Sequence, residues 1–425
     1  MSDAPKKHPR KTLRAHALVF YESVRMALGS VRSNKLRSVL TCLGIIIGVA
    51  TVISMMSIVK GVDGIVAKEL DRVGASSFVL TKYPALRVSF DWNKYRRRPD
   101  LTMEDVQAIL DQCPSVDLVA PLLVAWGKTV TAEGNKTDPN IGMIGTTSDY
   151  TAIMGLGVQE GRVFTNLENR RPRLVAILGV DVVDRVFPYG SPIGRYVRVD
   201  NYRLRVVGVM EERGAMFGES QDTRIIVPMP LILRKEGNTR NLEINIKARP
   251  DVPLAKAMNE VRTVMRIRHK VKVYEEDDFE LETRESITRA WSNLTGSIFA
   301  AAVGIAMISL LVGGVGIMNI MLVSVRERTR EIGVRKALGA RPRDIQRQFL
   351  IEASTLSLLG GVLGVSIGVG GMQALAAVTD KVPVIVTGFA VVLSLGFSIL
   401  VGIFFGVYPA RKAAHLDPIE ALRYE

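Results

Sequence analysis

Four long stretches of this chain contain no charged residue, and they constrain the fold more than any other feature. A helix needs about 20 apolar residues to cross a bilayer, and each stretch is at least that long. The first is too long and lies too far from the N-terminus to be a cleaved signal peptide. We therefore predict four transmembrane α-helices, at residues 38–59, 290–325, 353–379 and 382–410.

The distribution of charge predicts the orientation of these helices. Residues 1–37 carry nine Lys and Arg against two acids, and residues 326–352 carry eight against four. Basic loops stay on the cytoplasmic side, so both segments should be cytoplasmic. Residues 60–289 then lie outside, and the tail 411–425 is cytoplasmic. Because the excess charge lies beside apolar stretches and not on a folded domain, nucleic-acid binding is disfavoured.

The second stretch, 290–325, is too long for a single crossing. If helical, its 36 residues would reach roughly 54 Å, against an apolar core of about 30 Å. It could be a tilted helix with loose ends, or a helix that continues outward as a stalk. The preceding segment RESITRAW favours the stalk, because no Pro or Gly interrupts it before Gly296.

Glycines recur at four-residue spacing within the predicted spans. This spacing places them on one helix face, where two backbones can approach closely. The spans contain no Asp, Glu, Lys or Arg, which argues against a proton- or ion-driven carrier and against a hydrophilic pore. The predicted helix-packing residues are Gly44, Gly48, Gly360, Gly364, Gly368, Gly402 and Gly406.

Residues 60–289 have the pattern of a large α+β domain. Two βαβ units, at 60–129 and 229–289, have the content of a ferredoxin-like or split βαβ fold, here called porter-like. A β-rich subdomain is inserted between them at 130–228, and the Gly-containing loop 213–218 belongs to it. Expected strands are 77–81, 116–123, 174–178, 196–199, 203–209, 242–248 and 271–274, and expected helices begin at Thr102, with Asp105 as its capping partner, and at Val252.

The chain shows no motif for catalysis or for a cofactor. No nucleophile lies in a pattern with a base, and no glycine-rich phosphate loop is present. Cys42 and Cys113 should lie on opposite sides of the membrane boundary, so no disulfide is expected. The four histidines are scattered without metal-ligand spacing. We therefore predict neither an enzyme nor a metal site.

The predicted cytoplasmic loop contains a short charged helix. Residues 326–340 read RERTREIGVRKALGA, in which Glu331 and Arg335 form an i,i+4 pair. Leu338-Gly339-Ala340 is a helix stop. On composition alone, a charged connector that obeys the positive-inside rule is an equally good interpretation.

Several motifs resemble one family of membrane proteins. REIGVRKALGA followed by RPRDIQRQFLIEA, the preceding GVGIMNIML, the C-terminal YPARKAAHLDPIEAL and the external FPYGSPIGRYVRV are similar to MacB-like permeases. These belong to the type VII ABC transporters, which combine an FtsX-like permease domain with a MacB-type periplasmic core domain. The cytoplasmic and C-terminal motifs are the most specific.

The resemblance implies a permease subunit of an ATP-driven exporter in the bacterial inner membrane. Such a permease pairs with itself or a paralogue and binds two ABC ATPase subunits, which hold ATP and Mg; no cofactor belongs to this chain. A periplasmic membrane-fusion adaptor, an outer-membrane channel and membrane lipids are further implied partners. Motion passes to the periplasm by mechanotransmission. The implied ATPase-coupling residues are Arg326, Glu327, Arg328, Glu331, Gly333, Arg335, Lys336 and Gly339.

Two further expectations come from this resemblance. Residues 18–35 could form the amphipathic helix that precedes the first span in the family. MacB itself carries an N-terminal ATPase, whereas this chain begins about 37 residues before its first span, so we expect the ATPase on a separate polypeptide.

Two alternatives share this topology: a lipoprotein-releasing permease of the LolC/LolE type, and an FtsX-like transmitter that activates a cell-wall hydrolase. The sequence names no substrate, and macrolides, peptides, siderophores and lipids are all compatible.

Overall fold

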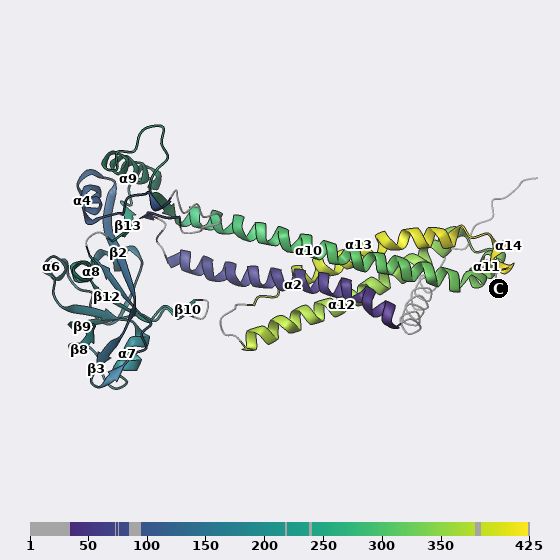
Figure 1. The fold of residues 1–425 in the computed structure, drawn as a ribbon, viewed down its shortest axis with the longest axis horizontal. Helices are drawn as coiled ribbons and strands as arrows, with labels where there is room; N and C mark the ends of the chain where they lie inside the picture. Colours follow the sequence, from purple (N-terminus) through teal and green to yellow (C-terminus); the bar gives the residue numbers. More distant parts are fainter. Residues whose placement is uncertain are drawn as a thin grey trace, which may run out of the picture. The chain divides into compact units, whose positions relative to one another are not determined.

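The computed structural model describes residues 35–72, 74, 76–84, 95–216, 219–237, 240–378 and 384–423. The described chain forms two compact units. The helical unit consists of the residues up to Val62 and from Thr295 onward, and the β-containing unit consists of Asp63–Leu294. Figure 1 shows the helices of the first and the sheet of the second. The expected amphipathic helix at 18–35 lies outside the described residues, apart from Lys35.

In the part of the chain that the structure describes, four helices are long and apolar enough to cross a membrane. Each predicted span falls largely within one of them, but the helices differ in length from the uncharged stretches. The long helices are α2 (Lys35–Arg72), α10 (Arg284–Glu327), α12 (Pro342–Val378) and α13 (Gly388–Ala414), and the short α11 (Thr329–Ala337) and α14 (Pro418–Arg423) follow α10 and α13. α10 is a single helix of 44 residues, so it includes both the RESITRAW segment and the apolar stretch.

Glycines allow the long helices to pack closely. A Cβ atom on Gly44 would lie 2.9 Å from the backbone nitrogen of Gly313, where α2 meets α10. A Cβ atom on Gly364 would lie 2.8 Å from Val49, where α12 meets α2. Larger side chains would force these backbones apart. The other predicted packing glycines also have close neighbours: Gly48 beside Leu310, Gly360 beside Ile45, Gly368 beside Ala50, Gly402 beside Ser357 and Gly406 beside Ala353.

The strands and helices at the two ends of the β-containing unit form the predicted split βαβ fold. Its strands are β1 (Ser77–Thr81), β2 (Val116–Lys128), β13 (Glu243–Ala248) and β14 (Glu280–Thr283), in the sheet order β14-β1-β13-β2 with antiparallel neighbours. Helices α4 (Met103–Gln112) and α9 (Leu254–Arg268) connect them. Each βαβ unit thus encloses one strand of the other. The predicted capping box at Thr102 and Asp105 is confirmed.

One predicted strand, at 271–274, is wrong. The segment lies in a turn, and Val273 and Tyr274 are 98% and 81% exposed. Lys270 has a positive φ of 58°, and the Val271 N–H donates to the Arg266 carbonyl, which ends the helix. The last strand of the fold is instead β14, which finds a partner in β1. Apolar composition alone cannot form a strand that has no neighbour to pair with.

The inserted β-rich part continues the same sheet. The long strand β2 pairs with β13 up to Leu122 and with β5 from Leu123, so it belongs to both parts. The order continues through β5 (Ile141–Thr146), β12 (Arg224–Pro228), β7 (Val175–Leu178), β9 (Tyr202–Met210), β8 (Tyr196–Val199), β3 (Val130–Ala132) and β4 (Asn135–Lys136), while β6 (Val158–Gly161) pairs with β9 and β10 (Ala215–Met216) pairs with β11 (Glu219–Ser220).

Short helices complete this part of the unit: α5 (Asp149–Ile153), α6 (Asn166–Arg170), α7 (Val180–Val186) and α8 (Met229–Glu236). α8 lies at the start of the predicted porter-like segment 229–289, where no helix was predicted, and it packs on β5 and β2; a Cβ on Gly145 of β5 would lie 2.0 Å from Ile232. The predicted loop 213–218 coincides with the β10–β11 hairpin, and its Phe217 lies outside the described residues. The hydrophobic cores around Phe78 and around Ile177 consist of side chains from distant parts of the chain.

Candidate functional site

The end of α10 leads almost directly into α11. Only Arg328 separates the two helices, and its N–H still donates to the Ser324 carbonyl at 3.1 Å. The Thr329 hydroxyl donates back to the carbonyls of Val325 and Arg326 at 3.0 and 2.9 Å. These hydrogen bonds make α11 a bent continuation of α10 and fix its starting direction.

An ion pair joins the start of α11 to α12. The Nη1 atom of Arg328 lies 3.4 Å from both carboxylate oxygens of Glu352, whose side chain is 1% exposed. A buried carboxylate is strongly destabilising unless it is paired, so this contact depends on both partners. Glu352 is not among the predicted coupling residues. The available signal was its position, as the last charge before the apolar stretch that begins at Ala353.

The opposite side of α11 packs on α14. Ile332 and Gly333 are buried, and a Cβ on Gly333 would lie 2.8 Å from the Cβ of Ala421. The Nζ atom of Lys336 donates to the Leu416 carbonyl at 2.5 Å, just before α14 begins. Gly333 and Lys336 therefore attach α11 to the end of the chain.

Arg335 forms a third attachment. It donates to Gln348 of α12 at 2.9 Å and to Glu331 at 2.5 Å, so the expected i,i+4 pair with Glu331 is formed. Gly339 ends this segment with φ 94°, a conformation that side-chain-bearing residues rarely adopt.

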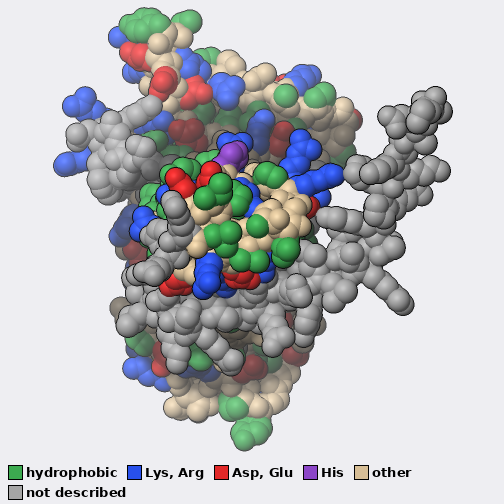
Figure 2. Space-filling model, turned by 90° about the vertical axis from the view of Figure 1, so that its right-hand side faces the viewer, with side chains coloured by type: hydrophobic (Ala, Val, Ile, Leu, Met, Phe, Trp, Pro, Cys, Tyr) green, Lys and Arg blue, Asp and Glu red, His purple; other side chains and the backbone are tan. Residues whose placement is uncertain are grey.

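The remaining face of α11 is exposed. Four of the eight predicted coupling residues lie there or beside it: Arg326, Glu327, Glu331 and Gly339. Two apolar side chains that were not predicted join them, Val334 at 43% and Leu338 at 84% exposure. Figure 2 shows this end of the helical unit, where exposed apolar side chains lie among Lys, Arg, Asp and Glu side chains. We call Arg326, Glu327, Arg330, Glu331, Val334 and Leu338 the α11 surface.

The arrangement suits the docking of another protein. Arg328, Gly333, Arg335 and Lys336 hold the helix against α12 and α14, whereas the α11 surface presents charged and apolar groups together. Interfaces commonly combine an apolar centre with a polar rim. The structure therefore divides the eight predicted residues between an attached face and an exposed face, and their role in coupling stays a prediction.

Two family models match the chain: the MacB-like periplasmic core domain over residues 38–264, and the FtsX-like permease C-terminal domain over residues 303–418. The chain is 36% identical over 424 residues to the macrolide export ATP-binding/permease protein MacB of Bdellovibrio bacteriovorus, a match that covers 99% of this chain and 64% of that protein. It is also 36% identical over 405 residues to the pyoverdine export ATP-binding/permease protein PvdT of Pseudomonas aeruginosa, covering 94% and 58%.

Among solved structures, the periplasmic region of MacB from Actinobacillus actinomycetemcomitans matches with 19% identity and a TM-score of 0.44, covering 54% of this chain and 98% of that one. The chain spans less than two thirds of the length of the curated relatives it matches. Together with the four apolar helices, the family matches indicate a multi-pass inner-membrane protein with a periplasmic domain. The chain belongs to the family of membrane permeases that have a MacB-like periplasmic core domain and an FtsX-like permease domain.

Proposed function

We propose that this chain is the permease part of an ATP-driven MacB-type exporter, and that the α11 surface docks on its ABC ATPase. One observation carries the proposal: α11 is attached to α12 and α14 by Arg328, Arg335 and Lys336, while Leu338 at its end is 84% exposed. A load on this surface would reach two neighbouring helices, because α11 is bonded to α12 through Arg328 and Arg335 and packs on α14 through Gly333. A freely moving charged loop would transmit no such load.

The orientation proposed for this site is cytoplasmic, as for both chain termini. The basic character of residues 1–37 and 326–352 supports it. ATP and Mg would be bound by the ATPase, and no step of hydrolysis is assigned to this chain. The permease would act as a pair with a second copy or a paralogue.

The proposed route of force is α10. This helix begins directly after β14 and ends one residue before α11, so its 44 residues connect the periplasmic domain with the docking helix along the chain. Its periplasmic end is fixed locally: Thr283 and Ser286 exchange backbone and side-chain hydrogen bonds, and the Trp291 indole donates to Asp63 of α2 at 2.9 Å. An α-helix carries compression well, because every turn is hydrogen-bonded to the next.

Substrate would leave from the periplasmic side without crossing the helical unit. The predicted spans contain no charged side chain to line a hydrophilic path. Relatives are named for the export of macrolides and of pyoverdine, which supports efflux as the process. An adaptor and an outer-membrane channel would complete the route outward.

A single substitution tests the docking surface. We expect Leu338→Glu to place a charge in the centre of the interface, and a central apolar contact is often worth about 2 kcal/mol or more, which corresponds to roughly thirtyfold in affinity. The protein with its ABC ATPase would be reconstituted in nanodiscs, and permease-stimulated ATP hydrolysis would be measured. Leu110→Glu is the matched control, because Leu110 is 50% exposed on α4 of the β-containing unit and lies outside the α11 surface.

The outcome separates docking from general damage. Stimulation should fall at least tenfold for Leu338→Glu and stay within twofold for the control. The paired change of Glu331 and Arg335 to Ala should also lower ATP-coupled export. Unchanged stimulation and export in both α11 variants would refute the proposal.

A further inference from the structure

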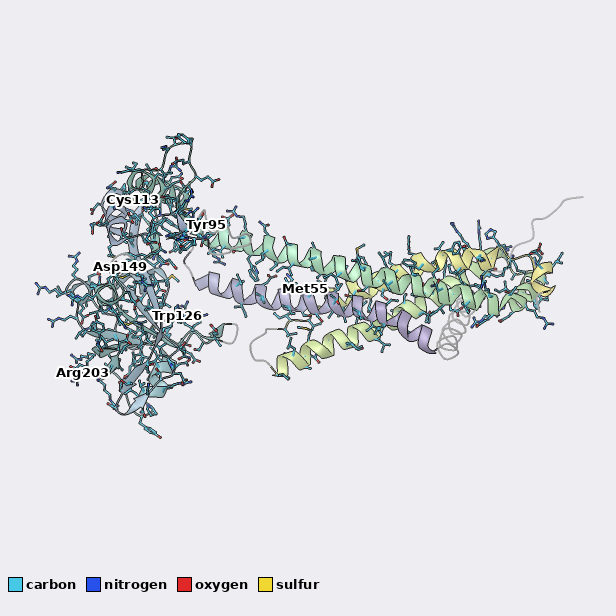
Figure 3. The ribbon with its side chains drawn as sticks, viewed as in Figure 1. Met55, Tyr95, Cys113, Trp126, Asp149 and Arg203 are labelled. Carbon is cyan, nitrogen blue, oxygen red and sulfur yellow. The ribbon has the colours of Figure 1, made fainter. Side chains whose placement is uncertain are left out.

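One face of the β8–β9 hairpin carries an unusual concentration of arginine. Tyr196 and Arg198 on β8, and Arg203 and Arg205 on β9, are exposed, while the residues between them on each strand, Val197 and Leu204, are buried. Residues two apart on a strand share a face, so these four side chains form one surface. Figure 3 labels Arg203 on this surface.

The register of the hairpin places like charges opposite each other. Arg198 is the direct cross-strand partner of Arg203, and Tyr196 is the partner of Arg205. Like charges in directly opposed positions destabilise a hairpin. The fold itself gains nothing from this pair, which points to a role outside folding.

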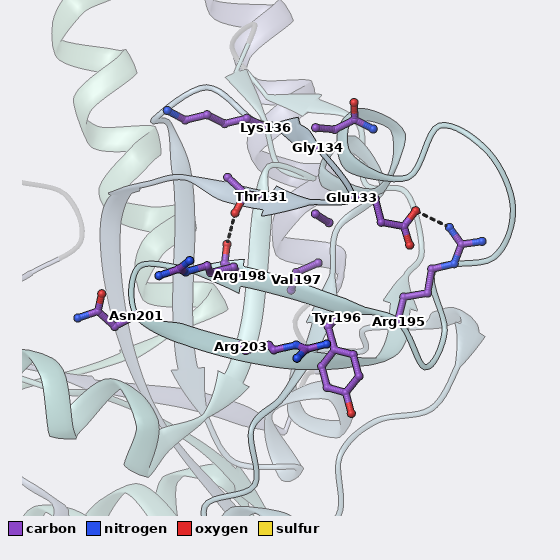
Figure 4. A pocket seen from close by; sticks show the side chains of 12 residues that line it. Thr131, Glu133, Gly134, Lys136, Arg195, Tyr196, Val197, Arg198, Asn201 and Arg203 are labelled. Carbon is purple, nitrogen blue, oxygen red and sulfur yellow. Dashed lines mark hydrogen bonds and ion pairs between the residues drawn. The ribbon is translucent and has the colours of Figure 1, made fainter.

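Two adjoining depressions in the surface meet at Tyr196 and Arg203. They measure about 800 and 810 Å³, and Figure 4 shows the first. We call their combined lining the arginine groove. Its charged residues are eight bases, Lys136, Arg162, Arg171, Arg173, Arg195, Arg198, Arg203 and Arg205, and two acids, Glu133 and Glu168.

Both acids of the groove are already bound. Arg162 donates two hydrogen bonds of 2.8 Å to Glu168. These bonds are the main cause that lowers the pKa of the Glu168 carboxyl to about 2. Arg195 bonds to Glu133 at 3.0 Å. Among the residues described by the structure, none forms an ion pair with the five other arginines: Arg171, Arg173, Arg198, Arg203 and Arg205.

The groove suits an anion that guanidinium groups can hold through two parallel hydrogen bonds, such as a carboxylate. Guanidinium groups bind carboxylates in a two-pronged geometry, as Arg162 does with Glu168 within the groove. The Arg203 guanidinium is held over the Tyr196 ring at 4.3 Å, which leaves its edge available to a ligand.

Apolar groups beside the arginines indicate a protein ligand. Tyr196 is 48% exposed, Leu174 45% and Leu167 63%. Arg and Tyr are, together with Trp, the residues most enriched at energetically important positions of protein interfaces. A bare phosphate surface would offer nothing to the tyrosine and leucines, whereas an acidic peptide segment has both carboxylates and apolar side chains.

We propose that the arginine groove binds an acidic polypeptide segment of a periplasmic partner. Carboxylates of the segment would occupy the forks of Arg198, Arg203 and Arg205, and an apolar side chain would pack on Tyr196. The proposal requires the periplasmic location of this domain but not ATPase docking at α11, so either can fail alone.

The test uses the full chain in nanodiscs of neutral lipid. The probe is a fluorescein-labelled twelve-residue peptide of alternating Glu and Leu with a central Tyr, and a Lys-for-Glu peptide is its control. Binding is followed by fluorescence anisotropy at low and at physiological salt. Arg198→Gln/Arg203→Gln is compared with Arg96→Gln/Arg97→Gln, a pair of exposed neighbouring arginines of the same domain that lie outside the groove.

The groove variant should bind the acidic peptide at least tenfold more weakly and with a smaller dependence on salt, while the control pair changes binding less than twofold. The groove variant should unfold at about the same temperature as the unmodified protein, because losing the repulsive pair offsets losing the contact between Arg203 and the Tyr196 ring, so weaker binding cannot be attributed to misfolding. Equal binding by both variants, or no binding by the unmodified protein at low salt, overturns the proposal. Binding to phosphatidylglycerol vesicles through the same arginines, without peptide binding, would assign the groove to lipid and also overturn it.

Discussion

The Nη1 atom of Arg328 lies 3.4 Å from each carboxylate oxygen of Glu352, and this contact joins the start of α11 to α12. Glu352 is 1% exposed and Arg328 is a quarter exposed, so the pair is shielded on one side only. Because the pair is largely shielded from water, loss of either charge should weaken the contact between α11 and α12.

We expect Glu352→Gln to destabilise the helical unit by about 2–3 kcal/mol, near the lower end for a broken buried pair because Arg328 keeps some solvent. The measurement is thermal unfolding of the purified protein in detergent. Glu331→Gln, which weakens an exposed pair on the same helix, should change stability by less than about 0.5 kcal/mol. The double variant Arg328→Gln/Glu352→Gln should cost less than the sum of the two single changes. Strict additivity would show that the two charges do not interact.

Gly333 should tolerate no side chain while Ala421 is present. Its Cβ would lie 2.8 Å from the Ala421 Cβ, so we expect Gly333→Ala to loosen α14 from α11. Hydrogen exchange in residues 416–423 should rise. Ala421→Gly in the same chain should restore protection, because it removes the clashing atom. If exchange rises equally with and without Ala421→Gly, the contact is not the cause.

Two glycines on α12 form a matched pair for close helix packing. A Cβ on Gly364 would lie 2.8 Å from Val49 and 2.9 Å from the Ile46 carbonyl, whereas one on Gly370 meets nothing within 4 Å. Gly364→Ala should cost about 1–3 kcal/mol through overpacking. Gly370→Ala should be neutral or slightly stabilising, since alanine favours helix. Thermal unfolding of the two variants checks this, and equal effects would contradict the packing described for α2 and α12.

Protonation of the Glu168 carboxylate at low pH should destabilise the part of the arginine groove around α6. Hydrogen bonds from Arg162 are the main cause that lowers its pKa from 4.5 to about 2. A folded-state pKa below the unfolded value adds stability that is present above pH 4.5 and is lost as the pH falls towards 2. Glu168 also forms the capping box of α6 with Thr165. The α6 amides should therefore be better protected from hydrogen exchange in the unmodified protein than in Glu168→Gln at neutral pH. Near pH 2 the two proteins should be equally protected. If the difference in protection between the two proteins does not change with pH, the ionisation of Glu168 is not what stabilises α6.

Local patterns in the sequence were sufficient for the membrane helices, for α4 and α9, and for many strands. The four uncharged stretches predict membrane helices because a bilayer leaves no other partner for backbone polar groups. Alternation at 242–248 predicts β13, and the capping box formed by Thr102 and Asp105 predicts the start of α4, since each depends only on neighbouring residues. The i,i+4 pair of Glu331 and Arg335 is equally local.

What the tertiary structure decided depends on residues that are distant in the sequence. It packed α8 on β5 because Gly145 leaves room for Ile232, and it made Glu280–Thr283 the last strand because β1 offered it a partner. It also brought Arg328 to Glu352, turned Gly333 towards Ala421 and gathered arginines from β8, β9 and the loop after α6 into one groove. A residue's own neighbours set its backbone conformation, but burial, charge pairing and surface charge follow from which segments meet, and only the folded chain fixes that.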